Sequence, residues 1–209
     1  MSEAIQDYDP AVDAPVHHHP IYDYDSGPPV DRGKFAIWLF LGTEVMFFTG
    51  LIGTYIVLRM GAASWPNPED RLAVDLTALN TFILITSSWF MVMALQAIQG
   101  GDQGAMKKWL LATIFGGSVF LGVQVYEYFV LFEAGALPNV DIFWSTFYAM
   151  TGFHGFHVFV GIVWLICAYF EAVKGEYTKE NYLRLELAGL YWHFVDLVWV
   201  LLFTIVYLM

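Results

Sequence analysis

The sequence predicts an all-α, polytopic integral membrane protein, built as a bundle of five transmembrane helices. Composition is the first reason: 58% of the 209 residues are hydrophobic and only 14% are charged, whereas soluble domains are about 45–50% apolar. The second reason is that five apolar segments recur along the chain, each long enough to cross a hydrocarbon core of about 30 Å as a helix of roughly 20 residues. Helices are expected because each one satisfies its own backbone hydrogen bonds inside the bilayer.

The five predicted spans cover residues 35–58, 74–98, 107–132, 142–171 and 185–209 and make up one membrane domain, residues 35–209. The segments between them carry Gly, Pro and Asn, which is typical of loops. Residues 1–34 precede the first span as an acidic segment without the apolar region of a signal peptide. We expect this segment to be a disordered tail. Its run His17–His19 could bind a metal weakly, but a solvated tail is the favoured interpretation, because no folded scaffold fixes a coordination geometry there.

The distribution of basic residues predicts the orientation of the bundle. Seven of the nine Lys and Arg residues fall on the N-terminal side of the membrane and two on the opposite side. The seven are Arg32, Lys34, Lys107, Lys108, Lys174, Lys179 and Arg184, and the two are Arg59 and Arg71. Because cytoplasmic loops carry the excess of Lys and Arg, we expect a cytoplasmic N-terminus. Five spans then place the C-terminus outside.

Polar side chains inside the predicted spans are the candidate functional residues, because such groups are costly in hydrocarbon and almost always face protein or water. They are Glu44 in the first span, Gln124 and Glu127 in the third, His154 and His157 in the fourth, and His193 and Asp196 in the fifth. Residues three or four apart are neighbours on a helix. We therefore expect His154 and His157 to project to one side, and Asp196 to hydrogen-bond His193. Depth along the helices predicts a buried polar cluster that joins the first, fourth and fifth spans.

These residues are compatible with several functions. Haem ligation would need His193 as the second axial ligand, because two histidines three residues apart cannot reach both faces of one haem; a copper or zinc site built from the three histidines is a further alternative. A proton or ion relay would make the chain an autonomous transporter. Interhelical hydrogen bonding is the favoured interpretation for His154, His157 and His193. Glu44 is expected to be protonated or hydrogen-bonded to another helix, and a role as proton antenna or lipid contact stays open.

No signal for catalysis accompanies these residues. The single cysteine, Cys167, excludes a disulfide framework and a cysteine metal cluster within this chain. The sequence contains no CxxCH haem-attachment motif and no Gly-rich phosphate loop. Its net charge of −11 argues against nucleic acid as a partner. The sequence thus predicts no catalytic, cofactor-binding or metal site of its own.

The chain resembles a known family, subunit III of the haem–copper terminal oxidases, over residues 34–209. The resemblance rests on five motifs that occur in the order of the family: "WLFLGTEVMFFTGLIGTYIVLR", "LNTFILITSS", "GVQVYEY", "STFYAMTGFHGFHVFVGI" and "YWHFVDLVWVLLFTIVYL". Glu44 matches the membrane acid of this family that reacts with carbodiimides, and Glu127 matches the acid of its Q-x-x-E-Y motif. For the histidines and Asp196, the resemblance implies structural importance rather than catalysis.

The resemblance implies a non-catalytic subunit of a proton-pumping oxidase in the bacterial plasma membrane. Its partners would be subunit I, subunit II and a small subunit IV, with haems and copper held by subunits I and II. Members of the family are expected to protect subunit I during turnover, to support proton uptake and to hold ordered phospholipids; membership of a respiratory supercomplex is a further expectation. By this resemblance we expect the chain to correspond to the bacterial five-helix forms, without the first two of the seven helices of larger members. Its motifs are more similar to the cytochrome c branch, of the aa3 or caa3 type, and a quinol oxidase is the alternative.

Overall fold

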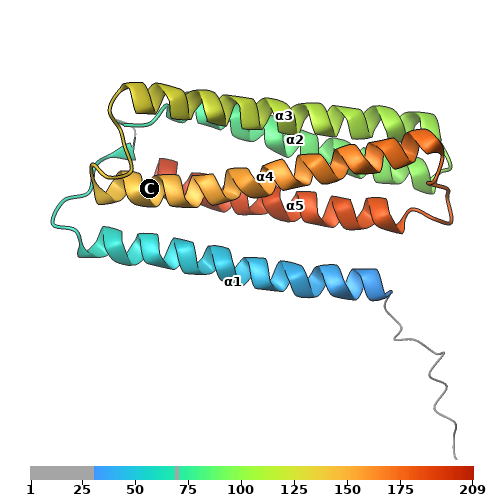
Figure 1. The fold of residues 1–209 in the computed structure, drawn as a ribbon, viewed down its shortest axis with the longest axis horizontal. Coiled ribbons are helices and arrows are strands. Elements are labelled where there is room, and N and C mark those ends of the chain that lie inside the picture. The colour runs from blue at the N-terminus through green and yellow to red at the C-terminus, as the bar shows by residue number, and fades with distance from the viewer. Residues whose placement is uncertain (1–30, 69–70) are drawn as a thin grey trace, which may run out of the picture. The chain divides into compact units, whose positions relative to one another are not determined.

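The computed structural model describes residues 31–68 and 71–209, and its regular structure there is helical (Figure 1). The helices are α1 (Arg32–Gly61), α2 (Val74–Gln99), α3 (Gln103–Glu133), α4 (Ile142–Lys174) and α5 (Leu183–Phe203), with a π-helical turn, η2 (Thr204–Leu208), continuing α5. All five are long and apolar enough to cross a membrane. The predicted all-α class with five spans is therefore confirmed. The predicted disordered tail, and the less favoured alternative of weak metal binding at His17–His19, concern mainly residues outside the described part of the chain. Residues 32–34, at the end of the predicted tail, are helical and form the first turn of α1.

Capping side chains mark the starts of two helices, and one of these starts differs from the hydropathy-based prediction. Asp102 accepts a hydrogen bond from the Ala105 backbone N–H at 2.8 Å, so α3 begins at Gln103 rather than at the predicted residue 107. Asp141 caps α4 in the same way through the backbone N–H of Trp144, at 2.9 Å. The predicted starts of the second and fourth spans, residues 74 and 142, coincide with the observed starts of α2 and α4. The remaining limits differ by a few residues, because the ends of these helices leave the apolar part of the sequence.

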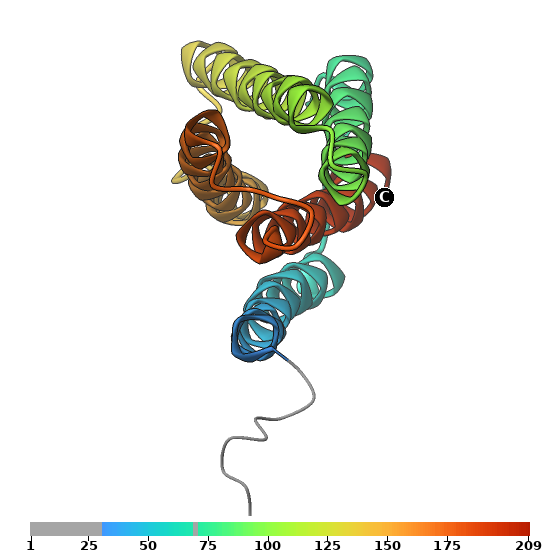
Figure 2. The ribbon, with the colours of Figure 1, turned by 90° about the vertical axis from the view of Figure 1, so that its right-hand side faces the viewer.

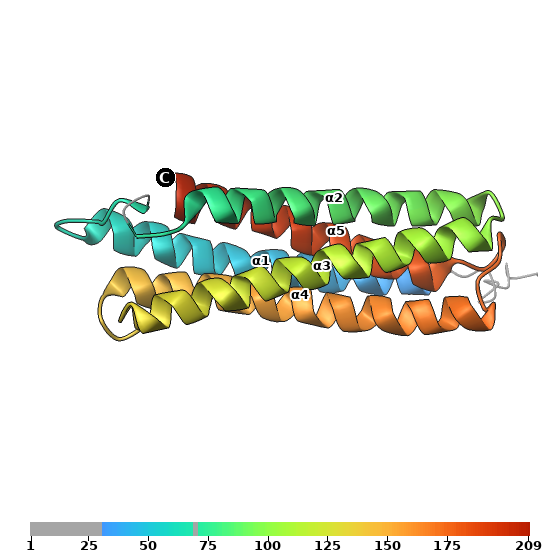
Figure 3. The same cartoon turned by 90° about the horizontal axis from the view of Figure 1, so that it is seen from above.

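Four of the helices form a closed arrangement in which α2 packs on α3, α3 on α4, α4 on α5, and α5 back on α2. Seen end-on, these four surround a common axis and α1 lies outside them, next to α5 (Figure 2). The view from above shows the helices running side by side along one direction (Figure 3). The core of the chain is therefore the α2–α5 bundle, and α1 is an accessory helix.

Helix α1 attaches to the bundle through side chains, most of them aromatic. Its most apolar stretch is only 17% buried, compared with 33–44% for the other four helices. Phe47 lies edge-on to Phe153 of α4 with ring centroids 5.1 Å apart, and Phe48 lies 6.4 Å from Phe194 of α5. Because so little of α1 is covered, its contacts with the bundle are few and individually important.

Trp192 of α5 ties the four helices of the bundle together. Its indole N–H donates to the hydroxyl of Ser87 on α2 at 3.2 Å. The ring lies against two glycines, Gly117 on α3 and Gly161 on α4. A Cβ on Gly117 would overlap the ring, lying 2.8 Å from Cζ2 and closer still to Cη2. Small residues at these two positions therefore allow the helices to approach closely around one large side chain, as is common in membranes.

Candidate functional site

Glu44 and His157 form a pair that joins α1 to α4. The Nε2 atom of His157 lies 3.1 Å from a carboxyl oxygen of Glu44, and both side chains are mostly covered. The Nδ1 atom of His157 lies 2.7 Å from the backbone carbonyl of Phe153, which can only accept, so Nδ1 carries a proton. The pair then shares one further proton between Nε2 and the carboxyl. Whichever atom holds this proton, the pair has no net charge, which suits its depth in the membrane.

His154 has different neighbours from His157. It is completely buried, stacks on Trp199 of α5 at 4.8 Å between ring centroids and meets the edge of Phe120 of α3 at 6.0 Å. Neither of its ring nitrogens has a hydrogen-bond partner among the described residues. The predicted interhelical hydrogen bond of His154 is therefore wrong for the described part of the chain. Three residues correspond to 300° around a helix, and this offset places the two histidines in separate contacts.

Gln124 joins α3 to α4. Its amide donates to the backbone carbonyl of Thr151 at 2.8 Å. The hydroxyl of Thr151 donates to the carbonyl of Phe147 at 2.7 Å, so the Tyr128 hydroxyl, 2.6 Å away, donates to Thr151 in turn. Through these bonds, the backbone carbonyl and the hydroxyl of Thr151 on α4 are held against α3.

Glu127 lies one helical turn beyond Gln124 but faces a different pair of helices. It is 7% exposed. One of its carboxyl oxygens lies 3.3 Å from the hydroxyl of Thr77 on α2 and 3.3 Å from that of Tyr207 in the π-helical turn. No cation among the described residues forms an ion pair with it. Single π-type turns often mark functional positions, and here the turn directs Tyr207 toward this buried acid.

His193 and Asp196 connect α5 to α2 rather than to each other. The Nδ1 atom of His193 lies 3.2 Å from the Ser88 hydroxyl, and Ser88 also contacts the Asp196 carboxyl. The predicted His193–Asp196 hydrogen bond is absent from the described contacts. Of the single polar cluster predicted for the first, fourth and fifth spans, the link between the first and the fourth is confirmed by the contact of Glu44 with His157. The fifth span does not join it through its predicted residues, since His193 and Asp196 turn to α2. Spacing within one helix could not identify Ser88 of α2 as their partner.

The described residues bring no metal site together. They contain no group of three His, Cys, Asp or Glu side chains placed to hold a metal ion. The three membrane histidines each contact different elements, so the alternatives of haem ligation and of a three-histidine copper or zinc site gain no support from the geometry.

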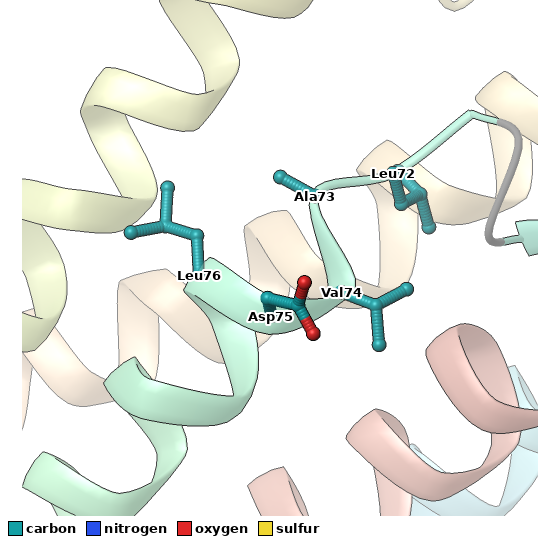
Figure 4. Close-up of a pocket in the computed structure, with 5 residues that line it drawn as sticks. All are labelled: Leu72, Ala73, Val74, Asp75 and Leu76. Carbon is teal, nitrogen blue, oxygen red and sulfur yellow. The ribbon is translucent and has the colours of Figure 1, made fainter.

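A surface recess lies directly before Thr77 in the sequence. It has a volume of about 530 Å³ and is lined by Leu72, Ala73, Val74, Asp75 and Leu76 at the start of α2 (Figure 4). Asp75 is the only ionisable residue in this lining. A catalytic centre needs several converging polar groups, and this recess does not provide them.

An ion pair that the sequence analysis did not identify joins two of the loops. Arg71 lies 2.6 Å from Asp141, and its guanidinium lies 5.7 Å from the ring centroid of Phe143. Burial raises the pKa of Asp141, but hydrogen bonds from the Trp144 backbone N–H and from Arg71 outweigh burial and hold the pKa below its usual value. The pair fixes the loop before α2 against the start of α4. Its two members are seventy residues apart in the sequence, so no local pattern could have revealed it.

Known proteins are similar in sequence to this chain over almost its whole length. The sequence profile of the family described as "Cytochrome c oxidase subunit III" matches residues 22–209. Cytochrome c oxidase subunit 3 from Alkalihalophilus pseudofirmus is 40% identical over 182 residues, which cover 85% of this chain and 87% of the relative. The protein of the same name from Thermostichus vulcanus is 36% identical, covering 93% of this chain and 90% of the relative. Quinol oxidase subunit 3 from Bacillus spizizenii is 34% identical, covering 83% and 85%.

Proposed function

The chain belongs to the cytochrome c oxidase subunit III family, and on that premise we propose that it stabilises the catalytic subunit of a proton-pumping haem–copper oxidase that receives its electrons from cytochrome c. As a subunit III it is a non-catalytic, multi-pass membrane component of an oxidoreductase complex. The proposal adds the electron donor, the direct contact with subunit I and the supporting role. Haems and copper would be held by subunits I and II, where O2 is reduced to water.

The observation that carries the supporting role is the way in which the polar side chains are used. Glu44 is matched by His157, Gln124 by Thr151, and Ser88 by His193, each time on another helix. Such bonds hold helices in register in a solvent where hydrophobic attraction between helices is weak. A chain whose polar side chains hydrogen-bond its own helices to one another is suited to present a rigid surface to a larger partner. Ordered phospholipids and support of proton uptake near Glu44 are parts of the same proposal.

Cytochrome c is the proposed donor because the relatives named for it reach 40% and 36% identity, whereas those named as quinol oxidase subunits reach 34% and 33%. The difference is modest, so a quinol oxidase is the second candidate. The haem types of the co-purified partner distinguish the two candidates.

We also propose that the N-terminus faces the bacterial cytoplasm and the C-terminus the outside of the plasma membrane. Seven basic residues lie on the N-terminal side and two on the other, as the positive-inside rule requires. A reporter enzyme that works only outside the cytoplasm should be active when it is fused after Met209. An inactive fusion would contradict the proposed orientation.

The supporting role is tested by comparing the oxidase purified from cells with and without this chain. The expected result is the same haem content and the same initial rate of O2 reduction per haem, followed by faster loss of activity during turnover when the chain is missing. A lower initial rate with normal haem content would assign the chain a direct part in the reaction. Equal activity and equal lifetime would contradict the supporting role.

A further inference from the structure

Among the described residues, His193 is a membrane histidine that its own chain matches only in part. Its ring is half-buried, and among the described residues only the Ser88 hydroxyl hydrogen-bonds it, through Nδ1. The neighbouring Asp196 is also half-buried, but its Oδ1 atom, which has no hydrogen-bond partner among those residues, is enclosed within the bundle. By contrast, the partly covered pair of Glu44 and His157 is matched within the chain, since the two side chains hydrogen-bond each other.

The depth of His193 makes this exposure costly. It lies ten residues after Leu183, the first residue of α5, which places it about 15 Å along a helix that crosses a core of about 30 Å. Water does not reach this depth, and lipid tails carry no hydrogen-bonding groups. Ionisable residues in membranes therefore almost always face protein or a hydrated cavity. A second protein surface must cover this part of α5.

The residues around His193 form an apolar face that another helix could cover. Leu197 and Val200 of α5 share its side of the helix and are 60% and 39% exposed. Ile85 and Val92, one turn before and after Ser88 on α2, are 45% and 38% exposed. We call Ile85, Val92, His193, Leu197 and Val200 the α2–α5 face.

We propose that a transmembrane helix of the haem-carrying subunit packs on the α2–α5 face and offers a polar side chain to Nε2 of His193. The inference rests on the proposed function, which supplies the partner. A second copy of this chain fits less well: a two-fold contact would bring residues of equal depth together, so it would set Asp196 against Asp196. The apolar residues provide close packing and the imidazole provides one directional bond, the combination by which membrane helices associate.

Photo-crosslinking of the intact complex tests where the partner lies. Benzoylphenylalanine is placed at Leu197 of the α2–α5 face or, as a matched control, at Val163 of α4, which is 44% exposed. The proposal expects an adduct with the haem-carrying subunit from position 197 and none from position 163. An adduct from position 163 alone, an adduct between two copies of this chain, or only lipid adducts at position 197 would overturn it.

Substitutions then test the hydrogen bond and the fit separately. His193→Leu should weaken retention of the chain by the complex about threefold to twentyfold during a detergent wash, the range that interhelical hydrogen bonds produce. Leu197→Trp adds bulk only on the exposed face, and it should also lower retention, whereas Val163→Trp should not. Equal retention of all three variants would overturn the proposal. If the native chain were purified without any haem-carrying partner, the proposed function itself would fail, and this outcome is distinct from a partner bound at another face.

Discussion

Replacing Gly117 with alanine tests whether Trp192 holds the α2–α5 bundle together. The new methyl group would lie 2.8 Å from Cζ2 of the indole and closer to Cη2. The indole is rigid, contacts Gly161 on its other side and donates to Ser87, so it cannot turn away without losing these contacts. Overpacking of this kind costs about 1–3 kcal/mol. Alanine offsets about 0.8–1.0 kcal/mol through its higher helix propensity, so the expected net change is a destabilisation of up to about 2 kcal/mol.

Gly122→Ala is the matched control on the same helix. A Cβ there would meet no atom within 4 Å, so only the favourable propensity remains. The two variants should therefore differ by about 1–3 kcal/mol in the free energy of unfolding. Unfolding is measured by titrating SDS into mixed micelles and following tryptophan fluorescence. If Gly117→Ala and Gly122→Ala unfold at the same SDS fraction, the space around Trp192 does not limit helix approach, and this account of the bundle is refuted.

Three other predictions follow from the contacts described above. His157→Leu removes the partner of Glu44 and should lower the free energy that holds α1 to the bundle by about 0.6–2 kcal/mol; an unchanged SDS midpoint would contradict a role for the pair in attachment. Tyr207→Phe removes one of the two hydroxyl donors of Glu127 and should cost about 0.5–1.5 kcal/mol, whereas equal stability would mean that the π-helical turn does not serve this acid. The pKa of Asp141 is lower in the folded chain than in the unfolded chain, where it is about 4. The stability that Asp141 contributes is therefore fully present above about pH 4, and it is lost as the pH falls through the pKa of the folded state. Melting temperatures recorded from pH 6 downward should show a shallower acid decline for Asp141→Asn, and identical declines would count against the depressed pKa.

The fold class was accessible from sequence because the physics of the bilayer is simple. Five apolar segments of sufficient length must be helices, since no other local structure satisfies its backbone in hydrocarbon. The ends were less accessible. The cap at Asp102 moved the start of α3 to Gln103, and such a cap depends on one side chain rather than on average hydropathy.

The candidate residues were identified correctly as polar positions inside helices, but their partners were not. His154 and His157 were expected on one side of α4, whereas the structure places His154 against Trp199 and His157 against Glu44. Two side chains three residues apart differ by about 60° in direction around the helix. This difference is large enough for each of them to contact a different neighbouring helix. The identity of the neighbouring helix is a tertiary property, so a single sequence without its bundle could not supply it.

Likewise, the role of α2 was not foreseen. Its residues Thr77, Ser87 and Ser88 are short polar side chains with no charge, and each one bonds a larger group on α3 or α5. Small hydroxyl residues are common in membrane helices and carry no pattern of their own. Only the positions of Glu127, Trp192 and His193 reveal why these hydroxyls face inward.

The central claim is that this chain is the third subunit of a haem–copper oxidase that uses cytochrome c. The measurement that tests it most directly is a pull-down of the tagged chain from its own membranes in mild detergent, with an optical spectrum and a copper assay of the eluate. The account predicts large membrane partners, copper and the absorbance of haem a. Haems of the b and o types without haem a would contradict the cytochrome c assignment and favour a quinol oxidase. A colourless eluate without large partners would contradict the claim itself.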